Sequence, residues 1–227
     1  MCFSAMIAKV TGQELIKSDL LDIKSIKTIG YPENSKEPEE DNRFYPKTWA
    51  PLLVRGREGF QLRPMRYQLL PSFCKEDKYT RVNPKTGRNV EIKNTFNARI
   101  DSLEERKAWQ PLFGKRHGAI CLQSFYEWVD RNGSKALIEF RPDNKENFWV
   151  ACLWDRWQKG EEYIDSFAMI TDEPNPEVLE KGHDRTPLIL KEEHLKDWLE
   201  PEVETKSELY ELLGDKKPVF FEGTFFG

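Results

Sequence analysis

Several features that would mark a membrane or secreted protein are missing from this sequence. No stretch approaches the roughly 20 consecutive apolar residues that a membrane-spanning helix needs. The amino terminus has no charged segment followed by an apolar one, so no secretory signal is predicted. These absences favour a cytoplasmic protein that does not enter a membrane.

Cysteine and histidine are too few and too scattered to suggest a metal site. None of the four cysteines forms a Cys-x-x-Cys pair, and only three histidines are present. We therefore expect neither a metal nor another cofactor. Cys121 and Cys152 lie in apolar runs, which favours burial, and Cys74 lies in a polar stretch. Cys2 directly follows Met1, so its thiol is either incidental to a short strand or chemically reactive.

The chain carries charges of both signs, with a net value of −4 over 227 residues. Residues 32–41 hold five acids and one base, so the rest of the chain sums to zero. Residues 75–93 hold six bases and three acids, which makes them either a solvated loop or a rim contacting a nucleic-acid backbone. With 38% hydrophobic residues, the chain can form one folded domain over residues 1–227.

Strand patterns dominate the middle of the chain. Residues 50–67 read as two short strands around a Gly-Arg-Glu-Gly turn. The runs 119–129 and 135–141 flank Asn132–Gly133, a strong hairpin signal, and 147–157 and 163–171 form the next pair. Consecutive strands joined by tight turns favour an antiparallel sheet.

Helix patterns lie toward the two ends. Capping-box spacing predicts helices over 11–23 and 102–113, the second limited by Pro111. Further helices are predicted over 175–182, 191–200 and 205–214, with a short tail after the last one. The fold class is therefore α+β, with a mostly antiparallel, barrel-like sheet and peripheral helices.

Four polar residues stand out against this framework. Asn97 and Arg99 occur where a strand gives way to the helix predicted at 102. Glu127 lies among aromatic residues, either desolvated and suited to proton transfer or facing water on an edge strand. His183 follows a predicted helix end, whereas His117 is predicted in a loop and His194 on a helix surface.

Taken together and in order, four motifs resemble the SRAP (SOS response-associated peptidase) family of abasic-site processing proteins. They are Cys2, Asn-Ala-Arg at 97–99, Phe-Tyr-Glu-Trp at 125–128, and His-Asp-Arg-x-Pro at 183–187. The segment 43–54 is also similar to that family. The resemblance runs from residue 2 to about 199, leaving 200–227 as a C-terminal helix and tail.

The resemblance implies a function in the response to DNA damage. It implies that Met1 is removed by self-cleavage and that Cys2 then bonds covalently to abasic sites in single-stranded DNA, with a possible lyase activity. By this likeness Asn97 shapes the site, Glu127 handles protons and His183 is the second acid/base. DNA contacts are implied for Arg43, Arg66, Tyr67 and Arg99. The expected protein is a monomer, associated with the nucleoid when bound to DNA.

The sequence also departs from the family pattern. Phe3 and Ser4 stand where the family usually has glycine and arginine, and Met65–Arg66 replaces a usual Trp-Gly pair. Two other functions therefore stay open. One is a cysteine peptidase that acts on other proteins through Cys2 and His183, and the other is a non-catalytic DNA- or protein-binding module on the same fold.

Overall fold

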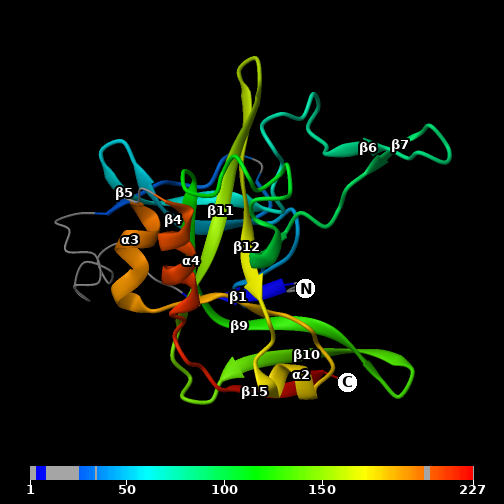
Figure 1. The fold of residues 1–227 in the computed structure, drawn as a ribbon, viewed down its shortest axis with the longest axis vertical. Helices are drawn as coiled ribbons and strands as arrows, with labels where there is room; N and C mark the ends of the chain where they lie inside the picture. The colour runs from blue at the N-terminus through cyan, green and yellow to red at the C-terminus, as the bar shows by residue number, and fades with distance from the viewer. Residues whose placement is uncertain (1–3, 9–25, 34, 202–204, 227) are drawn as a thin grey trace.

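The computed structural model describes residues 4–8, 26–33, 35–201 and 205–226, and its core is a closed barrel of five strands (Figure 1). The barrel strands are β4 (Trp49–Gly56), β5 (Gly59–Tyr67), β9 (His117–Arg131), β11 (Phe148–Lys159) and β12 (Glu162–Asp172). They pair in the order β4–β5–β12–β11–β9, and β9 pairs with β4 to close the ring. The β12–β5 pair is parallel and the other four are antiparallel. The predicted barrel-like α+β class is confirmed.

Tight turns join the two strands of each hairpin that the sequence predicts. Asn132 and Gly133 have φ angles of 55° and 80°, as a type I′ turn requires, and they join β9 to β10 (Ser134–Pro142). Gly59 lies in the β4–β5 turn with φ 124°, and Gly160 lies in the β11–β12 turn with φ 63°. The three predicted hairpins are therefore confirmed.

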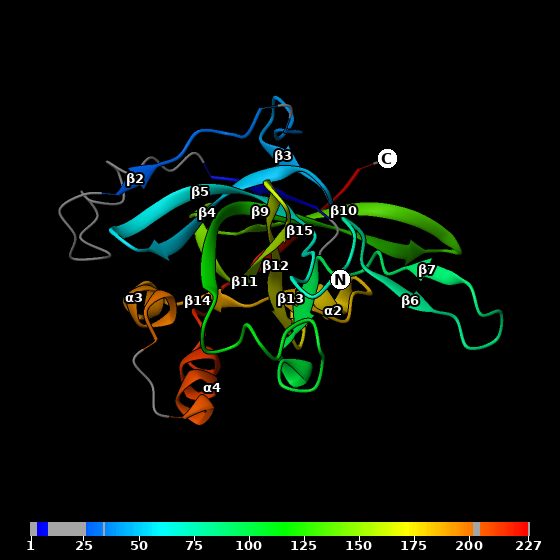
Figure 2. The same cartoon turned by 90° about the horizontal axis from the view of Figure 1, so that it is seen from above.

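Side chains alternate along the barrel strands between two apolar layers. One layer fills the interior and includes Leu52, Met65, Ile120, Cys152 and Phe167. The other covers the outside and packs beneath α3 (Leu195–Leu199) and α4 (Lys206–Gly214), which lie close together on one side of the barrel (Figure 2). The helices predicted near 191–200 and 205–214 are thus present, the first preceded by the short η2 (Glu192–His194).

The second half of β9 runs beyond the barrel and carries further strands of the same sheet. On one side it pairs with β1 (Ser4–Ile7), which pairs with β3 (Arg43–Phe44). On the other side it pairs with β10, which pairs with β15 (Phe221–Phe226). The C-terminal residues that the sequence suggests are a tail therefore include an edge strand.

The remaining elements are short. They are β2 (Lys27–Thr28), β6 (Thr80–Val82), β7 (Asn89–Glu91), β8 (Asn97–Arg99), η1 (Ile100–Ser102), α2 (Pro176–Glu180), β13 (Thr186–Pro187) and β14 (Ile189–Leu190). Strands β6 and β7 form a hairpin that projects away from the barrel, so part of the polar loop predicted at 75–88 is sheet (Figures 1 and 2). No helix within the described ranges is long and apolar enough to cross a membrane.

One helix prediction is wrong. Ser102 ends η1, and residues 103–113 form a succession of turns, not an α-helix. Leu103 and Leu112 are both buried, although nine residues would place them on opposite sides of a helix. Turns allow both side chains to reach the outer layer of the barrel. The helix predicted at 11–23 lies outside the described residues.

Candidate active site

The site is built around a buried acid–base pair. Glu127 on β9 is 2% exposed, and its Oε2 lies 3.1 Å from Nε2 of His183, which is 8% exposed. His183 lies in the loop between α2 and β13. The pairing joins β9 to the loop that follows the last barrel strand, β12, and helix α2. The two residues proposed from the sequence as proton-transfer groups therefore meet in space.

A bulge in β9 decides which way Glu127 faces. Met6 pairs with Ser124 but Ile7 pairs with Leu122, so Gln123 is an extra residue in β9. After this shift Phe125 and Glu127 share the buried face. Regular alternation along β9, taken without the bulge, would not show that Glu127 lies on the buried face.

The environment of the pair sets where its proton can be held. Nδ1 of His183 contacts two backbone groups of Arg185, the carbonyl oxygen at 2.9 Å and the N–H at 3.3 Å. The shorter contact favours a proton on Nδ1, because a carbonyl oxygen only accepts. Burial raises the pKa of Glu127, while the hydrogen bond to His183 opposes that rise. A second proton can therefore lie between Glu127 and His183 Nε2, and the pair can give or take it.

Strand β1 passes beside this pair. Ser4 is the first described residue and pairs with Tyr126, the neighbour of Glu127. Arg43 donates from Nε and Nη2 to Ser4 Oγ at 3.2 and 3.0 Å, and its guanidinium carbon lies 3.7 Å from the centroid of the Tyr126 ring. Arg43 thus places a cation next to β1. Cys2 lies outside the described residues.

A buried tyrosine forms a hydrogen bond to Asn97. It is 6% exposed at the start of β8, opposite Met169 of the parallel strand β12. Tyr67 Oη donates to Asn97 Oδ1 at 3.4 Å. Tyr67 itself has no exposed surface and packs against aromatic rings including Phe44 and Phe167. The predicted direct contact of Tyr67 with DNA is therefore corrected, because a side chain inside the barrel cannot stack on a base.

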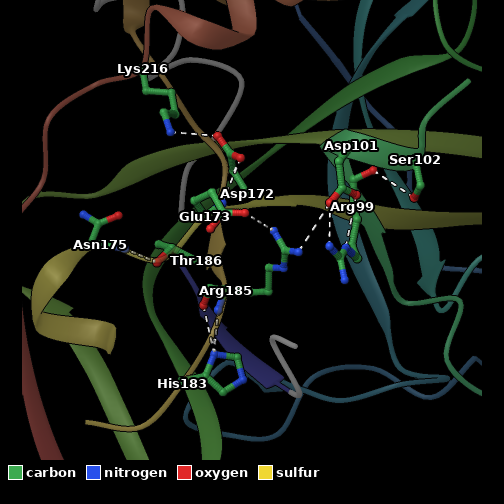
Figure 3. Close-up of polar contacts among 10 residues, drawn as sticks. All are labelled: Arg99, Asp101, Ser102, Asp172, Glu173, Asn175, His183, Arg185, Thr186 and Lys216. Carbon is green, nitrogen blue, oxygen red and sulfur yellow. Dashed lines mark hydrogen bonds and ion pairs between the residues drawn. The ribbon is translucent and has the colours of Figure 1, made fainter. Parts of the chain in front are cut away.

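Arg99 takes part in a network of ion pairs near His183 (Figure 3). Its Nε and Nη2 donate to the two oxygens of Asp101 at 3.1 and 2.5 Å. Asp101 also accepts from Arg185 Nη2 at 3.4 Å, and Arg185 Nη1 donates to Glu173 at 3.1 Å. Arg185, only 7% exposed, was not among the residues proposed from the sequence, although it is the Arg of the His-Asp-Arg motif.

A groove begins at Asn97 and Arg99 and continues toward the projecting hairpin. It encloses about 370 Å³ between the β6–β7 hairpin and the turns at 102–109. Its charged lining residues are Arg81, Glu91, Lys93, Arg99, Arg106 and Lys107, which are five cations and one anion. Two of the six bases in residues 75–93, Arg81 and Lys93, therefore line a groove that leads from the site.

Arg66 lies in a smaller cavity next to this groove. The cavity encloses about 110 Å³ and shares Tyr79, Glu91, Ile92 and Thr95 with the groove lining. Burial lowers the pKa of the Arg66 guanidinium, and Asp77 and Glu91 partly offset that effect. Of the four residues predicted to contact DNA, Arg66 and Arg99 thus border connected cavities, while Arg43 lies by β1.

Comparison with known proteins gives a consistent match. A family model described as SOS response associated peptidase (SRAP) matches residues 1–221. The chain is 33% identical over 167 residues to the abasic site processing protein YoaM of Bacillus subtilis, covering 71% of this chain and 66% of YoaM. It is 27% identical over 185 residues to the abasic site processing protein HMCES of Gallus gallus, covering 68% of this chain and 52% of that protein. The chain therefore spans less than two thirds of the length of these curated relatives.

Solved structures share the fold at lower identity. A crystal structure of a protein from Bordetella bronchiseptica matches with a TM-score of 0.71 and 18% identity over 100% of both chains. A protein from Bacteroides thetaiotaomicron matches with a TM-score of 0.69 and 16% identity, covering 100% of this chain and 92% of that one. These likenesses establish the fold alone.

Proposed function

The chain belongs to the SOS response associated peptidase (SRAP) family, and we propose that it binds single-stranded DNA and captures abasic sites covalently through Cys2. The observation that carries the proposal is the buried Glu127–His183 pair next to β1, where Ser4 pairs with Tyr126. Cys2 precedes Ser4 by two residues, and two residues of chain span at most about 7 Å. The proposal requires Cys2 to lie within reach of the pair.

Removal of Met1 would leave two nucleophiles on one residue. The α-amine has an ordinary pKa of about 8, so part of it is neutral near pH 7, and the thiol supplies some thiolate. The amine adds to the aldehyde carbon of the opened abasic sugar, and loss of water gives an imine. The sulfur then adds to the imine carbon and the nitrogen takes up a proton, which closes a thiazolidine ring. The second step gains from proximity because it is intramolecular.

The acid–base pair has a place in both steps. Loss of water from the carbinolamine needs a proton on the departing hydroxyl, and Glu127 can donate one because burial raises its pKa. His183 Nε2 can take the proton that the amine or thiol gives up. The same pair would assist Met1 removal, in which one water molecule adds to the Met1 carbonyl and the Cys2 nitrogen leaves with a proton.

Arg43 offers an explanation for the departure at position 4. The family resemblance leads us to expect an arginine there, but this chain has Ser4, whose hydroxyl accepts from the Arg43 guanidinium. We infer that Arg43 supplies, from β3, the cation that other members carry on the first strand. A phosphate beside the lesion is the proposed ligand of this group.

The DNA backbone is proposed to leave the site through the groove at Asn97 and Arg99. Its five cations and one anion suit a phosphodiester chain, and the Arg185 guanidinium adds a sixth cation at the site end. Asn97, held by Tyr67, is placed to hydrogen-bond the sugar or the Cys2 backbone. With these assignments, Asn97 and the groove cations all bind the sugar–phosphate backbone or position the lesion.

The test is the intact mass of the purified protein, measured alone and after incubation with an abasic oligonucleotide. We expect loss of Met1 and a denaturation-resistant adduct of one protein with one oligonucleotide. Cys2→Ala should abolish the adduct. Cys74→Ala is the matched control and should keep it, because burial raises the pKa of the Cys74 thiol to about 11. An adduct formed equally well by Cys2→Ala would refute the proposal.

A further inference from the structure

One end of the barrel opens into a cavity of about 570 Å³ that the candidate active site does not use. We call it the barrel-mouth cavity. Val54 and Arg63 line it from β4 and β5, Trp154 and Arg156 from β11, and Arg116 lies just before β9. It lies at the β4–β5 turn. Gly59 at this turn is eight residues from Tyr67 along β5, which corresponds to roughly 27 Å of strand. Tyr67 contacts Asn97, so the cavity lies far from the candidate active site.

Two buried carboxylates hold the arginines of this cavity in place. Asp165, 3% exposed, accepts from Arg156 Nε and Nη2 at 2.7 and 2.8 Å and lies 3.3 Å from Arg63 Nη1. Asp155, 2% exposed, accepts from Arg116 Nη1 at 3.0 Å. Guanidinium groups fixed from behind lose little conformational entropy when a ligand binds their free edges.

Positive charge remains in excess after these pairs are counted. The cationic lining residues are Lys27, Arg55, Arg57, Arg63, Arg116 and Arg156. Four carboxylates oppose them, those of Glu58 in the lining and of Asp155, Asp165 and Glu200 in ion pairs. Two positive charges are therefore left over, in a chain whose net charge is −4. Lys27 and Arg57 form no ion pair with any other residue that the structure describes.

We propose that the barrel-mouth cavity is a second anion site that binds a phosphate group. Guanidinium groups match phosphate oxygens in paired hydrogen bonds, and two surplus charges suit a phosphate better than a single carboxylate. The mouth of a β-barrel is also a common place for a ligand. The phosphate can come from the backbone of bound DNA or from a free phosphorylated compound, and the two sources can be distinguished by experiment.

The first arm uses inorganic pyrophosphate as the probe and isothermal titration calorimetry on the full chain. The double variant Lys27→Ala/Arg57→Ala removes two cations that no described carboxylate pairs with, so no buried carboxylate loses its partner. We expect pyrophosphate affinity to fall by about tenfold or more in this variant. Lys135→Ala/Lys196→Ala makes the same change in net charge on exposed positions elsewhere and should bind like the wild type.

The second arm uses an undamaged oligothymidylate of 20 nucleotides, chosen as the probe without an aldehyde, at several salt concentrations. If the phosphate belongs to DNA, the double variant should flatten the plot of log affinity against log salt by about 0.7 for each lost contact. An unchanged DNA slope with weakened pyrophosphate binding would assign the site to a free phosphorylated compound. Equal binding of both probes by wild type and double variant would overturn the proposal. Because neither probe contains an abasic site, these results are independent of Cys2 chemistry.

Discussion

Glu127 and His183 face each other at 3.1 Å between Oε2 and Nε2, although 56 positions separate them in the sequence. Both side chains are nearly excluded from solvent, and the Arg185 carbonyl oxygen fixes the far side of the imidazole. A proton between them is thus shielded from bulk water and shared by two groups. The covalent chemistry proposed for this chain uses such a proton.

Replacing Glu127 should slow adduct formation without removing the nucleophile. Glu127→Gln keeps the shape but cannot donate a carboxyl proton, so we expect the crosslinking rate to fall by about 10²- to 10⁴-fold. Glu139→Gln on the neighbouring strand is the control for the proton-transfer role, since Glu139 bonds Tyr126 and Arg141 rather than His183. Single-turnover crosslinking measures both. A Glu127→Gln rate within twofold of wild type would contradict the assigned role.

The crosslinking rate should also depend on pH through Glu127. Burial raises its pKa, so the carboxyl keeps its proton above the pH at which an exposed Glu loses it. A step that uses this proton slows as pH rises through the raised pKa. By linkage, stability present at low pH is also lost over that window, because the folded state binds the proton more tightly. Glu127→Gln should therefore remove the alkaline limb of the rate profile and be less destabilised at high pH than wild type.

Asp101 should restrain DNA binding. Its carboxylate accepts from both Arg99 and Arg185, so it competes with phosphate for the same guanidinium groups. We expect Asp101→Asn to bind undamaged single-stranded DNA several-fold more tightly at low salt, with a smaller gain at high salt because the effect is electrostatic. Fluorescence anisotropy across salt concentrations gives the comparison with Arg99→Ala, which should bind more weakly. Weaker binding by Asp101→Asn would show instead that Asp101 holds the arginines in a productive position.

His117 should make the fold sensitive to acid. The sequence suggests a loop residue, but His117 begins β9, is 3% exposed and stacks on Trp198 at 3.7 Å between ring centroids. Burial lowers its pKa to about 4, whereas the unfolded chain takes up the proton near 6.5. The stability present above pH 6.5 is therefore lost as pH falls toward 4, by about 3 kcal/mol for this group.

Urea unfolding at pH 7.5 and 4.5 checks this expectation. His117→Asn should lower the unfolding free energy at pH 7.5, because the stacking is lost, and should show a smaller further loss at pH 4.5. His194→Gln, on the partly exposed η2 segment, should keep the wild-type difference between the two pH values. An acid-induced loss of the same size in His117→Asn and wild type would place the effect in other groups.

Gly118 should tolerate no side chain. Its position in β9 faces the barrel interior, and a Cβ there would lie 2.5 Å from Leu52 Cδ2 and 2.9 Å from Leu52 Cγ. Overpacking of this kind costs about 1–3 kcal/mol, so we expect Gly118→Ala to lower the melting temperature by several degrees. Gly214→Ala at the end of α4 meets no atom within 4 Å and should leave it nearly unchanged. Equal melting temperatures for both variants would show that Leu52 can move aside.

Local signals in the sequence predict the parts of the fold that depend on neighbouring residues. Asn132–Gly133 specifies a hairpin because both positions accept positive φ, and the hairpin is present. Cys121 and Cys152 are buried as the apolar runs around them suggest. The predicted helix at 102–113 fails because capping spacing does not report that Leu103 and Leu112 must both reach the same apolar layer. The prediction that Tyr67 contacts DNA has the same weakness, because a local motif does not show that the ring packs in the barrel interior.

Motif order, hairpin signals and residue chemistry along the chain were enough to predict the family, the α+β class and the identity of the polar residues. How those residues act together depends on the tertiary structure. An extra residue in β9 turns Glu127 inward, and the path of the chain after β12 brings His183 to it. Barrel closure gathers the arginines of the barrel-mouth cavity from the β4–β5 hairpin, from the residues before β9 and from β11. Such long-range register and closure arise from packing of the whole sheet, which no local stretch of sequence encodes.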